Sequence, residues 1–297
     1  MKMPAFCYHR PATVDEAVGL LAAYGGDAKV LAGGQSLVPL LALRLSRPAH
    51  VIDIGRVSGL ETVVAEDGPG GLRIGAGVRH AAVERSSAVA GAAPLLAAAV
   101  PHIGHRAIRN RGTVCGSLAH ADPAAELPAV ALAVDAEVIA RSVTGERRLP
   151  AAGFFLGYLT TGLDEAELLT AVRFPPWPPA TGWSVQEVSR RHGDFALIGL
   201  AAIVGLDESG RIERAALSFF GAGSTPLRVE EAERVLAGEH PEPAAFAEAA
   251  ELVAKTLDPP GDIHATAAYR AHVAGVLTRR GLAEAAGRAR PESAGPA

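Results

Sequence analysis

The spacing of apolar residues along the first half of the chain predicts helices and short strands in alternation. Residues 14–24 carry apolar side chains at helical spacing, after Thr13 and with Glu16 at the third position, which is a capping box. Gly25-Gly26 then ends this helix. Continuous apolar runs predict buried strands at 28–31 and 51–54, and alternating runs predict a hairpin of 60–65 with 72–75.

Further along, the pattern predicts the remaining elements of the first part and then a boundary to a second part. Helices are expected at 81–89, 94–100 and 124–133, and strands at 136–142 and 168–174. Pro175-Pro176-Trp177-Pro178-Pro179 cannot lie inside a sheet and forms a stiff connector. After it we expect a strand at 184–189, a hairpin of 197–206 with 212–220, and helices at 229–236, 243–257 and 265–280.

Small residues gather in two loops, and this is the chemistry that stands out. Ala32-Gly33-Gly34-Gln35-Ser36-Leu37 follows the strand at 28–31, and Gly112 to Ser117 precedes a helix start indicated by Asp122-Pro123. Glycine lets the backbone approach a ligand, and a helix N-terminus presents unpaired N–H groups to an anion. One such loop alone is equally well a tight surface turn. Two of them can hold a pyrophosphate from both sides.

The two loops together resemble a known family. AGGQSL and RNRGTVCGSLAHADPAAELP are similar to the motifs of the FAD-binding medium subunit of molybdenum hydroxylases, the group of xanthine dehydrogenase and aerobic carbon monoxide dehydrogenase. The resemblance extends from Phe6 to about Gly281. The chain departs from the family at Cys115, where glycine is usual, and at Val78 and Arg79, where relatives often carry threonine.

The resemblance implies an α+β fold. An FAD-binding domain of the p-cresol methylhydroxylase/vanillyl-alcohol oxidase type, with two subdomains, would be followed by a smaller C-terminal domain with an antiparallel sheet and helices. We expect the FAD-binding domain at 1–176 (subdomains about 1–55 and 56–176), the C-terminal domain at 177–284, and a disordered tail at 285–297.

The resemblance also implies the residues that contact FAD. Ile103 would pack on the adenine, Glu126 would lie near the ribose or adenine, and Phe195 would lie over the flavin. The expected cofactor-binding set is Ala32, Gly33, Gly34, Gln35, Ser36, Leu37, Ile103, Thr113, Gly116, Ser117, His120, Asp122, Glu126, Leu169 and Phe195.

Several of these residues have a plainer interpretation. Glu126 can be an acid of a first helical turn, Phe195 a core aromatic at a strand start, and Asp122 is more readily an N-cap than a ligand contact. Arg109 and Arg111 could contact phosphate, but we favour solvated or interface roles for them.

Composition excludes several classes of function. A net charge of −4 without any dense basic block argues against a nucleic-acid partner, and no apolar run reaches the length of a membrane span. The N-terminus lacks the apolar segment of a signal peptide, so we expect a cytoplasmic protein. An iron–sulfur cluster normally takes four cysteine ligands, and this chain has two cysteines.

Other site types find little support. His102 and His105 form an H-x-x-H pair but are interpreted as loop histidines rather than metal ligands. Residues 74–80 contain G-x-G without the third glycine of a dinucleotide-binding turn. No nucleophile or zinc motif is present, so no catalytic or metal-binding residue is assigned and redox work must come from a cofactor.

The expected function is therefore that of an electron-transfer subunit. By resemblance, a large partner would carry the molybdenum cofactor and a small partner two-iron two-sulfur clusters, in a dimer of heterotrimers (a heterohexamer). FAD in this chain would pass electrons to an external acceptor. The alternatives are a self-sufficient flavin oxidoreductase of the same fold and a non-enzymatic assembly or regulatory protein that has lost its flavin. The sequence names neither the hydroxylated substrate nor the acceptor.

Cys115 poses a local question. If its position requires positive φ, the side chain strains the loop, whereas at negative φ it is tolerated. We expect negative φ, with the thiol as a small apolar filler and not a redox centre.

Overall fold

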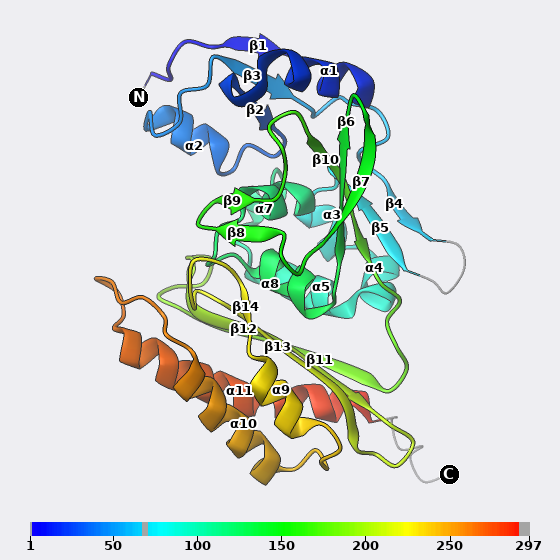
Figure 1. Ribbon diagram of the computed structural model, residues 1–297, viewed down its shortest axis with the longest axis vertical. Helices are drawn as coiled ribbons and strands as arrows, with labels where there is room; N and C mark the ends of the chain where they lie inside the picture. The colour runs from blue at the N-terminus through cyan, green and yellow to red at the C-terminus, as the bar shows by residue number, and fades with distance from the viewer. Residues whose placement is uncertain (1, 67–70, 291–297) are drawn as a thin grey trace. The chain divides into compact units, whose positions relative to one another are not determined.

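The computed structural model describes residues 2–66 and 71–290 (Figure 1). By their contacts these residues form two compact units, each built from separate segments of the chain. Among the described residues, unit 1 comprises 2–66, 71–86, 105–121 and 136–175, and unit 2 comprises 87–104, 122–135 and 176–290. The predicted boundary at 176 describes domains that follow one another in sequence, and it does not express this interleaving.

Unit 1 begins with a three-stranded parallel sheet of order β1-β3-β2. Its strands are β1 (Cys7–His9), β2 (Ala28–Leu31) and β3 (His50–Asp53). Helix α1 (Val14–Tyr24) starts with the predicted capping box and ends at Gly25, which has φ 49°. Strands β2 and β3 and helix α1 confirm the prediction made from the sequence pattern in this region.

The rest of unit 1 contains a five-stranded antiparallel sheet and several short helices. The order is β4-β5-β10-β6-β7, and the turn between β4 and β5 includes positions outside the described residues. The strands are β4 (Val63–Ala65), β5 (Leu72–Gly75), β6 (Glu137–Ser142), β7 (Gly145–Pro150) and β10 (Leu168–Phe174), with β8 (Phe155–Gly157) and β9 (Thr160–Thr161) as a separate pair. The helices are α2 (Leu37–Ala42), α3 (His80–Glu84), α6 (Arg106–Arg109) and α7 (Val114–His120).

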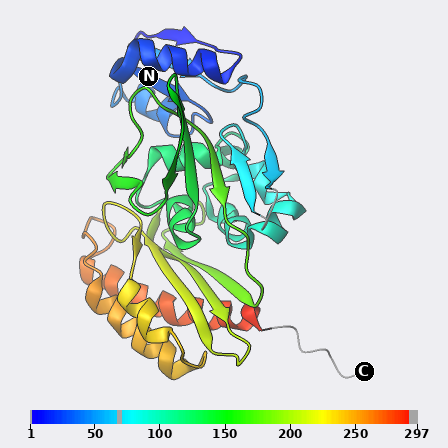
Figure 2. The ribbon, with the colours of Figure 1, turned by 45° about the vertical axis from the view of Figure 1, so that its right-hand side comes forward.

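Unit 2 is a four-stranded antiparallel sheet with helices packed on it (Figure 2). Its strands are β11 (Thr181–Ser189), β12 (Ala196–Leu206), β13 (Ile212–Phe220) and β14 (Leu227–Arg228). Helices α9 (Glu230–Leu236), α10 (Pro243–Thr256) and α11 (Ala267–Ala289) share one apolar core with β12 and β13. From earlier in the chain, α4 (Ser87–Ala92), α5 (Pro94–Ala99) and α8 (Glu126–Ala133) also belong to this unit, and Ala129 of α8 packs with Phe220.

Three predicted elements differ in the structure, and one helix was not predicted. The helix expected at 81–89 is two helices, α3 and α4, because the Ser86 amide donates to Val83 and closes a turn. The helix expected from 124 begins at Glu126. The tail expected from 285 is helical to Ala289, since three alanines there are buried in the unit 2 core. Helix α7, which overlaps the expected loop at 112–117 and extends beyond it, was not predicted at all.

Candidate functional site

The first small-residue loop lies directly against the second. A Cβ atom on Gly33 would be 2.5 Å from the Arg111 carbonyl oxygen and 2.6 Å from Gly112 Cα. No side chain fits there, so glycine at 33 permits the two loops to touch. The neighbouring Gly34 has φ +74°, a conformation that glycine adopts without strain. The expectation that these distant loops meet is therefore confirmed.

The first loop keeps its backbone donors open. Within the described residues, the amides of positions 33–37 donate to no protein acceptor, and the first helical bond of α2 runs from Val38 to Gly34 at 3.1 Å. The Gln35 side chain folds back, and its Nε2 donates to the Gly33 carbonyl at 3.1 Å. Open N–H groups beside a close backbone approach fit the diphosphate of a dinucleotide.

The second loop is the first turn of α7, and three of its amides already have protein acceptors. Thr113 is 2% exposed. Its Oγ1 accepts from the Gly116 amide at 3.0 Å, and its carbonyl accepts from Ser117 at 3.1 Å. The Val114 amide donates to Val78 at 3.2 Å. A threonine before small residues is an N-cap signal, and sequence reasoning overlooked it because it read the small residues as a turn.

Cys115 lies inside α7, where φ is negative, as expected. The thiol is 2% exposed and Sγ lies 3.6 Å from the Ile74 carbonyl oxygen on β5. Burial raises the pKa of this thiol far above its ordinary value. The side chain thus fills space against the neighbouring strand, and the filler interpretation is supported.

His80 supports the second loop from behind, a role that sequence reasoning missed. It is 4% exposed, and a Cβ on Gly112 would lie 2.9 Å from its Nδ1. Burial lowers the pKa of His80 to about 4, so the ring is neutral at pH 7. The nearby Arg79 and Arg109 charges lower it further.

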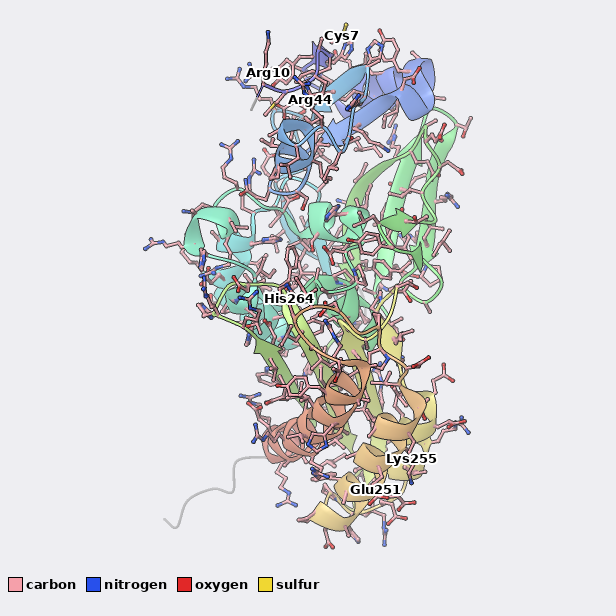
Figure 3. The ribbon with its side chains drawn as sticks, turned by 90° about the vertical axis from the view of Figure 1, so that its left-hand side faces the viewer. Cys7, Arg10, Arg44, Glu251, Lys255 and His264 are labelled. Atoms are coloured by element: carbon pink, nitrogen blue, oxygen red, sulfur yellow. The ribbon has the colours of Figure 1, made fainter. Side chains whose placement is uncertain are left out.

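A cavity of about 550 Å³ opens beside the first loop, within unit 1. Besides loop residues, its walls carry four arginines from four separate segments and one carboxylate: Arg10, Arg56, Arg79, Arg111 and Asp53. Arg10 lies just after β1, beside the N-terminal strands (Figure 3). Asp53 is already engaged, since Tyr8 Oη donates to one oxygen and the Gly55 amide to the other at 2.8 Å. The cavity is therefore strongly cationic.

The expected FAD contacts divide between the two units. Unit 1 holds the first-loop residues with Thr113, Gly116, Ser117, His120 and the buried Leu169, whereas unit 2 holds Ile103, Asp122, Glu126 and Phe195. Phe195 is 69% exposed, so its interpretation as a core aromatic is wrong. Asp122 is not the N-cap of α8. Its Oδ1 accepts from the Ala124 amide at 2.9 Å, and Ala125 caps the helix without a side-chain bond.

Unit 2 also holds an acidic pair that the sequence did not reveal. The Glu187 side chain on β11 is 5% exposed, and its Oε2 has no hydrogen-bond partner among the described residues, although His102 Nδ1 lies at 3.5 Å. Burial raises the pKa of Glu126 to about 8 and that of Glu187 to about 7. Their mutual repulsion also raises the pKa of Glu126. No local pattern marks Glu187, because its acidic neighbour comes from a helix much earlier in the chain.

The described residues also bear on a metal site and on a membrane span. They contain no group of three or more His, Cys, Asp or Glu side chains arranged to hold a metal ion. No helix among them has the length and hydropathy to cross a membrane.

Comparison with known proteins assigns the class. The profile of the FAD binding domain in molybdopterin dehydrogenase matches residues 4–177, and that of the CO dehydrogenase flavoprotein C-terminal domain matches residues 183–285. The chain therefore belongs to the FAD-binding medium subunits of molybdenum hydroxylases.

Individual relatives are similar over nearly their whole length. The chain is 45% identical to the 6-hydroxypseudooxynicotine dehydrogenase complex subunit alpha of Paenarthrobacter nicotinovorans, covering 98% of each chain. It is 36% identical to the carbon monoxide dehydrogenase medium chain of Hydrogenophaga pseudoflava, covering 94% of this chain and 96% of that one. A solved structure of the carbon monoxide dehydrogenase from that organism superposes with a TM-score of 0.93 at 37% identity, covering 97% and 99% of the two chains.

Proposed function

We propose that this chain receives electrons from an iron–sulfur partner subunit and passes them, through FAD, to an external acceptor. When bound, FAD supplies one-electron and two-electron chemistry, which such a position requires. The open backbone donors of the first loop, held against Arg111 and Gly112, are the observation that carries this proposal. With only two cysteines, the chain needs clusters supplied by another subunit.

We infer that the FAD-binding residues are those expected from the sequence, with changed roles in the second loop. Ala32 to Leu37 would bind the diphosphate through their amides, and Gly116 serves to make room, since a Cβ there would lie 2.6 Å from Thr113 Oγ1. Ser117 offers its hydroxyl. Glu126 and Glu187 could accept bonds from ribose hydroxyls or an adenine amine, because Oε2 of Glu187 has no hydrogen-bond partner among the described residues.

We also propose the assembly: a large molybdenum-cofactor subunit and a small iron–sulfur subunit, in a dimer of heterotrimers. The family supports such partners, since its relatives are named as medium chains and as a subunit of a complex. Co-purification of a tagged chain with products of neighbouring reading frames tests this directly.

Spectroscopy and kinetics test the electron-transfer role. The purified chain should show the visible bands of oxidised FAD, and acid precipitation should release the flavin. In the reconstituted complex, substrate should bleach those bands, whereas the chain alone should not react with it. Substrate oxidation by the isolated chain would favour a self-sufficient flavin oxidoreductase instead.

A further inference from the structure

The two loops offer unequal numbers of backbone donors. Amides of the first loop have no protein acceptor within the described residues, while the Val114, Gly116 and Ser117 amides of the second loop donate to Val78 or to Thr113. A diphosphate carries two negative charges and needs donors on more than one side. Because these three amides of α7 are already bonded, side-chain donors can supply the rest of the second side.

Two arginine residues near the first loop can supply the donors that the second loop lacks. Arg79 and Arg111 line the cavity beside the first loop, and Arg79 Nη1 donates to the Arg111 carbonyl oxygen. That same carbonyl is the atom against which Gly33 packs. A guanidinium has five N–H donors in a rigid fork that matches phosphate oxygens, so one bond to a carbonyl leaves most of them for a ligand.

The electrostatics of the cavity favour an anion. Four guanidinium groups share it with one carboxylate, which Tyr8 and Gly55 already engage. Burial and the neighbouring Arg111 charge both lower the pKa of Arg79, and Asp53 only partly opposes them. Holding like charges together costs free energy, which an anion placed between them offsets.

We propose that Arg79 and Arg111 are the charged donors that hold the FAD diphosphate against the first glycine loop. The inference rests on the proposed FAD site. It assigns two binding residues beyond the loop amides, and it makes FAD affinity depend on salt. Arg10 and Arg56 are exposed at the same cavity and steer the anion toward it.

Titration of apo-protein with FAD, followed by flavin fluorescence at two salt concentrations, tests the assignment. Arg79→Gln and Arg111→Gln should each weaken FAD binding about ten- to hundred-fold, the range for hydrogen bonds to charged groups. Their remaining affinity should depend less on salt than that of the parent. Arg79→Lys should restore part of the affinity, because it keeps the charge but loses the fork.

Two controls separate this role from a structural one. Arg85→Gln removes the same charge from an exposed position at the end of α3 and should leave FAD binding unchanged. Riboflavin lacks the diphosphate, so its weak binding should be equal in the parent and both variants. Equal loss of riboflavin and FAD would show that Arg79 only braces the loop, and unchanged FAD affinity in both variants would overturn the proposal.

The outcomes remain distinct from failure of the FAD function itself. If the parent chain bound no FAD, the proposed function would be wrong before any variant was compared. If Arg79→Gln failed to fold, the comparison of Arg111→Gln with the parent would still decide the matter, because the Arg111 side chain is exposed.

Discussion

At the scale of single residues, Gly33 tests the contact between the loops. Gly33→Ala places a methyl group 2.5 Å from a backbone oxygen, so the loops must separate. We expect at least a tenfold loss of FAD affinity by apo-protein titration, with lower thermal stability. Gly91→Ala is the matched control, since no atom lies within 4 Å of its new Cβ. Equal FAD affinity in the Gly33 variant and the parent would show that the close approach has no part in binding.

The two cysteines should differ sharply in reactivity. Cys7 is exposed, whereas Cys115 is buried and its pKa is raised by burial. A thiol reagent at pH 8 should therefore label one group quickly in the native protein and two after unfolding. Cys7→Ser should abolish the fast phase. Rapid labelling that persists in that variant would contradict the filler role of Cys115.

At the scale of elements, the cap of α7 links stability to the site. Thr113→Ala removes the acceptor for Gly116 and should cost about 1 kcal/mol of stability. Thr13→Ala removes the equivalent cap of α1, because Thr13 Oγ1 accepts a hydrogen bond from the Glu16 amide at 3.1 Å. Urea unfolding should show similar losses for both variants, but only Thr113→Ala should weaken FAD binding. A parallel decrease in FAD affinity for both variants would mean that α7 has no special relation to the cofactor.

Regular elements were predictable where one local signal was sufficient. The capping box of α1, strand β2 and the hairpin of β12 with β13 follow from residue order alone. Helix α7 was missed because its Gly and Ser residues have poor helix propensity. The buried Thr113 cap and packing on β5, β9 and β10 stabilise it. The first loop was located by its glycines, but its contact with Arg111 depends on residues far apart in sequence.

The same limit applies to the charged parts of the site. Arg79 was noticed as a departure from threonine, and Arg111 was assigned to solvent or an interface. The sequence does not reveal that either residue shares a cavity with Arg10 and Arg56. Glu187 was not noticed at all, because burial of a carboxylate is a property of the packed sheet and not of its neighbours along the chain.

At the scale of the whole molecule, the acidic pair predicts how stability changes with pH. Both carboxyls have an ordinary pKa of 4.5, raised to about 8 for Glu126 and about 7 for Glu187 in the folded state. Their destabilising effect is absent below pH 4.5 and grows as the pH rises through these values, because the unfolded chain loses the protons first. His102 and Asp122 are the ionisable side chains that face these two carboxyls, and neither reverses the direction in which stability changes with pH.

Glu187→Gln should therefore become more stable than the parent as the pH increases. We expect equal melting temperatures near pH 5 and a higher one for the variant at pH 9. Glu251→Gln is the control, because this carboxylate forms only an exposed ion pair with Lys255 on α10 (Figure 3). A constant difference between Glu187→Gln and the parent across the pH range would show that ionisation is not the cause.

The interleaved segments also determine the order in which the chain can fold as it leaves the ribosome. Helix α8 packs on β12 and β13, which are synthesised only after the proline connector. Until then, its buried face, including Leu127 and Ala129, has no sheet to cover it. A nascent chain that has completed the segments of unit 1 therefore still exposes the apolar face of α8 to solvent. A chimaera joined at the connector would pair α8 of one parent protein with the β12–β13 sheet of the other.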